Sequence, residues 1–89
     1  MDIVRHAMKL TAEISLYPLQ SDYIPIIRDY IEQLNLHSEL KIFTKAISTQ
    51  VMGDYDTVMT ILQKTMKHTH STYGKAVFVV KFIGGELAI

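Results

Sequence analysis

The order of two hydrophobic periodicities constrains the fold of this chain more than any other feature. Four short segments either alternate apolar and polar residues or are apolar throughout, and both patterns are typical of β-strands. They are residues 9–17, 39–44, 47–52 and 75–83. Two further segments, 24–34 and 58–66, repeat apolar residues every three or four positions, which is typical of amphipathic helices. With right-handed crossovers, the order β-α-β-β-α-β predicts an α+β, ferredoxin-like sandwich. Its four-stranded antiparallel sheet has the order 4-1-3-2, with two helices on one face.

Turn and capping residues predict where the elements end. Pro18 ends the first strand because it cannot donate a ladder hydrogen bond. Asp22 is expected to cap the first helix, and Asp54 or Asp56 the second. The second helix is expected to fray at residues 68–71, and residues 45–46 to connect the two middle strands. The apolar helix positions expected in the core are Ile24, Ile27, Ile31, Leu34, Val58, Ile61, Leu62, Thr65 and Met66.

Length and composition predict one domain and exclude several classes of function. Of the 89 residues, 9–89 are expected to form a single ferredoxin-like domain, and 1–8 a lead-in that can be disordered. Nine basic residues balance nine acidic ones, which argues against nucleic-acid binding. The longest apolar run, residues 76–80, is too short for membrane insertion. Residues 1–8 hold no apolar segment typical of a secretory signal, so a cytoplasmic location is expected.

No pattern in the sequence indicates an enzyme or a cofactor site. The chain has no cysteine, no Gly-x-Ser-x-Gly motif and no glycine-rich phosphate loop. Of the four histidines, only His68 and His70 lie close together, with few acidic neighbours to complete a metal site. We therefore expect neither catalysis, nor a metal, nor a cofactor.

The sheet face opposite the helices, called here the outer face, is expected to be covered by a partner or a ligand. On the first strand this face carries Thr11, Glu13, Ser15 and Tyr17. The last strand is apolar on both sides, with Val77, Val79 and Ile83 alternating with Ala76, Phe78, Val80 and Phe82. A strand that is apolar on both sides is usually covered on both sides. This pattern predicts either sheet-to-sheet association or a ligand pocket on the outer face.

Polar residues at the centre of the predicted sheet suggest a binding site. Ser15 and Tyr17 lie at the end of the first strand, while Ser48 and Thr49 lie in its predicted neighbour. Hydroxyls among apolar strands need hydrogen-bond partners, which either a planar nitrogen heterocycle or nearby backbone provides. Ser48 and Thr49 alternate to opposite faces. A pocket under the helices would therefore use Thr49, and one on the outer face Ser48 with Ser15.

The same residues resemble a known family. The segments Ile14-Ser15-Leu16-Tyr17-Pro18-Leu19 and Ile47-Ser48-Thr49-Gln50-Val51-Met52-Gly53 are similar to motifs of the YkoF-like thiamine/hydroxymethylpyrimidine-binding proteins. The resemblance covers residues 9–86. It implies a ferredoxin-like domain that binds the pyrimidine part of thiamine without transforming it, in thiamine salvage, uptake or sensing.

The resemblance also implies site residues and self-association. Ser15, Tyr17, Ser48 and Thr49 match the motif positions, and we add Glu13 because a carboxylate can accept a hydrogen bond from the amino group of the pyrimidine. Members of the family associate through their sheets, so a homodimer or homotetramer is expected. The alternative is an oligomeric protein–protein interaction module that binds no small molecule.

Overall fold

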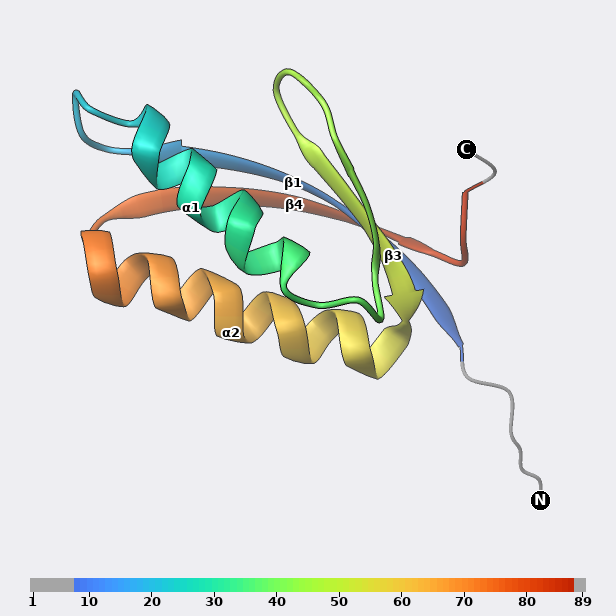
Figure 1. Ribbon diagram of the computed structural model, residues 1–89. Helices are drawn as coiled ribbons and strands as arrows, with labels where there is room; N and C mark the ends of the chain where they lie inside the picture. The colour runs from blue at the N-terminus through green and yellow to red at the C-terminus, as the bar shows by residue number, and fades with distance from the viewer. Residues whose placement is uncertain (1–7, 88–89) are drawn as a thin grey trace.

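The computed structural model describes residues 8–87 and has the expected order of elements (Figure 1). These are β1 (Lys9–Pro18), α1 (Ile24–Asn35), β2 (Lys41–Thr44), β3 (Thr49–Asp54), α2 (Tyr55–Tyr73) and β4 (Ala76–Gly84). The strands form one antiparallel sheet of order β2-β3-β1-β4, and both helices lie on the same face of it. The predicted ferredoxin-like fold is therefore confirmed. Of the predicted lead-in, all but Met8 falls outside the described residues, as do residues 88–89 of the predicted domain.

The hydrophobic core lies between the sheet and the two helices. Alternation along β1 turns Leu10, Ala12 and Ile14 toward the helices, and all three are buried. From α2, the predicted positions Val58, Ile61, Leu62 and Thr65 are also buried. No helix among residues 8–87 combines the length and the apolar character needed to span a membrane.

The buried stripe of α1 differs from the one predicted. The buried residues are Ile26, Tyr30 and Leu34, whereas Ile24 is 52% exposed. Ile27 and Ile31 are only half-buried. The apolar arc of this helix is wide enough for two adjacent stripes, each spaced by four residues. The core takes one stripe, and the other borders a pocket described below.

Several element ends also differ from the prediction. The N-cap residue of α1 is Tyr23 rather than Asp22, with no side-chain capping bond. Asp54 is at the N-cap position of α2, but its carboxylate accepts a hydrogen bond from Lys9 Nζ at 2.7 Å instead. The β2–β3 connection is a four-residue loop, 45–48, rather than two residues, because the Lys45 N–H donates to the Ser48 carbonyl and closes it. β3 therefore begins two residues later than expected, and β2 also begins two residues later, at Lys41.

The second helix continues to Tyr73 and does not fray at residues 68–71. Thr69 is fully buried and donates a hydrogen bond to the Thr65 carbonyl at 3.3 Å. Gly74 ends the helix with φ = +90°, a conformation that favours glycine. The sequence of the last two turns is a poor helix former. Their tertiary contacts therefore keep these residues helical.

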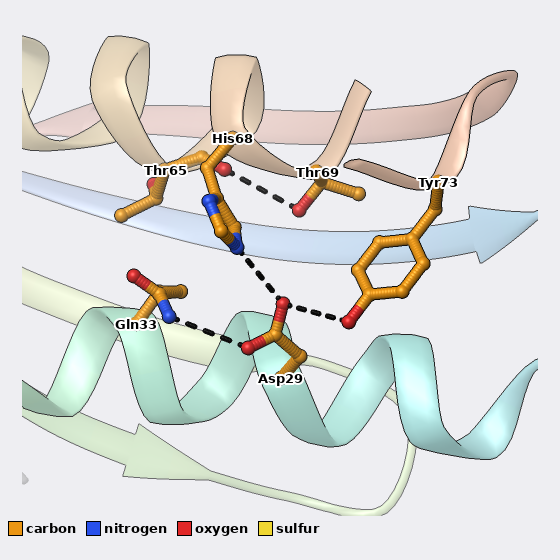
Figure 2. A network of polar contacts seen from close by, with 6 residues as sticks. All are labelled: Asp29, Gln33, Thr65, His68, Thr69 and Tyr73. Atoms are coloured by element: carbon orange, nitrogen blue, oxygen red, sulfur yellow. Dashed lines mark hydrogen bonds and ion pairs between the residues drawn. The ribbon is translucent and has the colours of Figure 1, made fainter. Parts of the chain in front are cut away.

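One carboxylate joins the two helices (Figure 2). Asp29 Oδ2 on α1 accepts hydrogen bonds from His68 Nε2 and the Tyr73 hydroxyl of α2, both at 3.0 Å. Asp29 Oδ1 accepts a third bond from Gln33 Nε2 at 3.3 Å. Burial would raise the pKa of Asp29, but these donors outweigh it and lower the pKa below its ordinary value. The carboxylate in turn raises the pKa of Tyr73. These contacts tie α1 to α2.

The outer face is covered at one end and open at the other. At the covered end, Thr11 and Met52 are buried beneath the segment that follows β4. Thr11 Oγ1 donates to the Gly85 carbonyl at 2.8 Å, and the Leu87 N–H donates to Met52 Sδ at 3.4 Å. Along β4 the apolar outward side chains stay 45–46% exposed: Val77, Val79 and Ile83. Lys81 lies between Val79 and Ile83 on the same face.

Candidate functional site

A pocket of about 480 Å³ opens between α1, the end of β1 and the loop 45–48, and is called here the α1 pocket. Its volume lies within the range of about 300–1,000 Å³ that is common for small-molecule sites. Its lining is mainly apolar and consists of Ile14, Leu16, Tyr17, Pro18, Tyr23, Ile27, Ile31, Lys45, Ala46, Ile47, Ser48 and Thr49. The pocket therefore lies on the helix side of the sheet.

Three elements supply the walls of the α1 pocket. Tyr23, Ile27 and Ile31 are spaced by four residues, so one face of α1 forms a wall. Ile14 and Leu16 contribute the inward side of β1. Thr49, the first residue of β3, is 5% exposed and brings the most deeply buried hydroxyl of the lining described here. The result is an apolar slot with a hydroxyl at its sheet side.

The structure separates the five predicted site residues into two groups. Tyr17, Ser48 and Thr49 line the α1 pocket, whereas Glu13 and Ser15 do not. Ser48 Oγ donates to Glu13 Oε2 at 3.1 Å, and Ser15 Oγ donates to the Ile47 carbonyl at 3.3 Å. Glu13 and Ser15 therefore anchor the loop 45–48 to β1 from the outer face. The binding roles predicted for all five residues remain predictions.

Sequence reasoning missed the α1 wall and Lys45. The wall could have been predicted from the width of the apolar arc of α1. A single core stripe cannot include Ile26, Ile27, Tyr30 and Ile31 together. Lys45 was assigned to a two-residue connection, which concealed that it opens a loop bordering a pocket. Among the lining residues in the described part of the chain, Lys45 is the one charged side chain.

Elsewhere in the described residues, neither the second hollow nor the titratable side chains form a comparable site. A second hollow of about 690 Å³ lies between α2 and the edge strand β4, lined by Met59, Met66, Phe78 and Phe82 among others. It contains none of the residues that the family motifs single out. Within residues 8–87, no group of three or more histidine, aspartate or glutamate side chains is placed to hold a metal ion. The α1 pocket is therefore the candidate site.

Solved structures of other proteins share this fold. A Streptococcus pneumoniae protein aligns with a TM-score of 0.82 and 22% identity, with 90% of each chain covered. A Thermotoga maritima protein, for which a role in thiamine biosynthesis or salvage has been suggested, has a TM-score of 0.76 and 18% identity, covering 83% of this chain and 81% of that one. A hypothetical protein of Methanocaldococcus jannascii has a TM-score of 0.74 and 23% identity, covering 84% and 78%. At these identities the likeness establishes the fold.

Sequence comparison establishes the family. The sequence matches no curated protein. Residues 9–83, which include all four strands up to Ile83 and both motif segments, match the YkoF-related family. The chain therefore belongs to the YkoF-related family.

Proposed function

We propose that this protein binds thiamine or its hydroxymethylpyrimidine moiety without transforming it, in thiamine salvage, uptake or sensing. The observation that carries the proposal is the α1 pocket, whose β1 wall and buried Thr49 belong to the two motif segments and whose remaining apolar wall comes from α1. The role in thiamine biosynthesis or salvage suggested for the similar Thermotoga maritima protein supports the same ligand class.

The chemistry of the lining suits a small aromatic heterocycle. Ile14, Ile27 and Ile31 offer apolar surface to the two faces of a ring. The Thr49 hydroxyl can donate to a ring nitrogen or accept from an exocyclic amino group. Tyr17 and Tyr23, each about half exposed, supply aromatic surface. This combination of apolar walls and one buried hydroxyl is what an aminopyrimidine needs.

The lining also suits binding better than catalysis. The side chains described around the α1 pocket include no carboxylate, histidine or cysteine. Of the groups that act in general acid–base catalysis, the lining holds Lys45, Tyr17 and Tyr23, and all three are exposed to solvent. A binding role asks only for shape and hydrogen bonds, which the pocket supplies.

Removing the Thr49 hydroxyl is expected to weaken ligand binding and to leave the fold intact. Thr49→Val keeps the shape of the side chain and removes one hydrogen bond, which should cost about 0.5–1.5 kcal/mol of binding free energy. Calorimetric titration with hydroxymethylpyrimidine measures the effect. Thr44→Val is the matched control, because Thr44 lies directly opposite Thr49 in the sheet but outside the pocket lining. Equal affinity for the two variants would show that Thr49 is not the contact.

The outer face favours a second property, self-association. Val77, Val79 and Ile83 present half-exposed apolar surface along β4. On β3, which is separated from β4 by β1, Gln50 Oε1 is buried with no hydrogen-bond partner among the residues described. We propose that a second copy covers this face, giving a homodimer or homotetramer. In the alternative function, an interaction module without a ligand, this association would be the whole activity.

Light scattering tests the proposed association. The protein is expected to be a dimer or tetramer at tens of micromolar, about the range of ordinary interface affinities. Val79→Glu places a carboxylate beside Val77, on the apolar part of the outward side of β4, and should shift the mass to that of the monomer. Thr72→Glu, on the exposed side of α2, is the control and should leave the oligomer unchanged. A monomeric parent protein would contradict the proposal.

A further inference from the structure

Lys45 is a solvent-exposed residue of the α1 pocket lining, and its backbone is fixed by the loop 45–48. Its N–H donates to the Ser48 carbonyl at 2.8 Å, which closes the loop 45–48. The loop is fastened to β1 by Ser48 Oγ bonding to Glu13 and by the Ile47 carbonyl bonding to Ser15. The backbone of Lys45 is therefore fixed at an edge of the pocket, and its flexible side chain can bring the ammonium group to that edge.

The positive charge at this edge is not offset within the pocket. The ion pairs formed among residues 8–87 do not include Lys45. Glu13, the carboxylate nearest in the sheet to the loop, faces the outer side, where it contacts Ser48 and lies 3.8 Å from Lys81 Nζ. The described lining thus combines apolar walls, hydroxyls and one cation, with no carboxylate.

A single cation in the lining should favour pyrimidine compounds that carry negative charge. Thiamine carries a cationic thiazolium, which would meet the Lys45 ammonium at the pocket entrance with no carboxylate to balance it. A phosphate ester carries two negative charges, and a lysine ammonium is a common partner for phosphate. We propose that the preferred ligand is a phosphorylated aminopyrimidine, hydroxymethylpyrimidine phosphate, whose ring occupies the slot beside Thr49 and whose phosphate binds Lys45. This inference rests on the proposed function and names its ligand.

Calorimetric titration of the purified protein with three probes tests the preference: hydroxymethylpyrimidine, its phosphate ester and thiamine. The ester is expected to bind about three- to tenfold more tightly than the unphosphorylated pyrimidine, and thiamine no more tightly than the unphosphorylated pyrimidine. Lys45→Met should abolish the gain of the ester over the unphosphorylated pyrimidine, whereas Lys45→Arg should retain that gain. Lys41→Met is the matched control, since Lys41 lies on the same hairpin opposite Met52, on the outer face. The gain should also shrink as salt is raised.

The outcomes separate this inference from the function on which it rests. If the pyrimidine or thiamine binds but the ester binds no more tightly, the inference is wrong and the proposed function is supported. The inference is also wrong if Lys45→Met weakens all probes by one factor, or if Lys41→Met has the same effect. If none of the three probes binds, both the inference and the proposed function are overturned.

Discussion

Tyr30→Ala is expected to lower the free energy of unfolding by about 3–5 kcal/mol, the usual cost of truncating a buried aromatic residue. Tyr30 is 3% exposed, and its ring centroid lies 5.0 Å from that of Phe78 on β4. Its hydroxyl lies 3.3 Å from the Thr65 hydroxyl on α2. One side chain therefore connects α1 with both α2 and the sheet. Since a domain of this size is typically stable by about 5–15 kcal/mol, the loss should be visible in urea unfolding followed by circular dichroism.

Tyr30→Phe is the control that isolates the ring from the hydroxyl. It keeps the apolar contacts and should cost no more than about 1.5 kcal/mol at neutral pH. Burial raises the pKa of Tyr30 to about 12, although the Thr65 hydroxyl bond opposes the shift. Because the folded-state pKa is raised, the contribution of Tyr30 is fully present below pH 10 and is lost as the pH rises toward 12. The phenylalanine variant should lack that loss. Equal losses for Tyr30→Ala and Tyr30→Phe at neutral pH would mean that packing is not the main contribution.

Asp29→Asn is expected to destabilise the protein by about 1.5–3 kcal/mol at pH 7, the range for hydrogen bonds to a charged group. The amide cannot reproduce the three bonds from His68, Tyr73 and Gln33 that Asp29 accepts (Figure 2). The pKa of Asp29 is lowered in the folded protein, so its contribution is present above the unfolded value near 3.8. It is lost as the pH falls through the folded value. The stability curves of the parent and Asp29→Asn should therefore converge in acid.

Urea unfolding at a series of pH values from neutral to acid measures this convergence. Asp22→Asn is the matched control, because Asp22 is an exposed carboxylate just before α1 that makes no capping bond to the helix. It should change the stability by no more than about 0.5 kcal/mol at any pH. A pH-independent difference between the parent and Asp29→Asn would show that the substitution disturbs packing instead. A loss of ligand affinity in Asp29→Asn would be consistent with α1 being both the partner of α2 and a wall of the pocket.

Much of the fold could be predicted from local pattern. Alternation along residues 9–17 identified β1 and its inward side. The order of the six elements, together with the rule that crossovers are right-handed, was enough to predict the order of the strands in the sheet. The motif segments around Ser15 and Ser48 indicated the family that residues 9–83 confirm. These properties are encoded within a few residues of each position, because the pleat and the helical turn repeat over such short distances.

The location of the site depended on tertiary structure. The sequence by itself determined that Ile27 and Ile31 face inward, but periodicity cannot say whether another element covers them, and here they border an open pocket. Likewise, Ser15 was expected to meet the segment of Ser48 and Thr49, yet only the tertiary structure shows that Glu13 and Ser15 anchor the four-residue loop from the outer face. A cavity forms on the side of the sheet where the helices and loops leave space unfilled. That filling depends on side-chain volumes from segments far apart in the chain, which a local pattern does not contain.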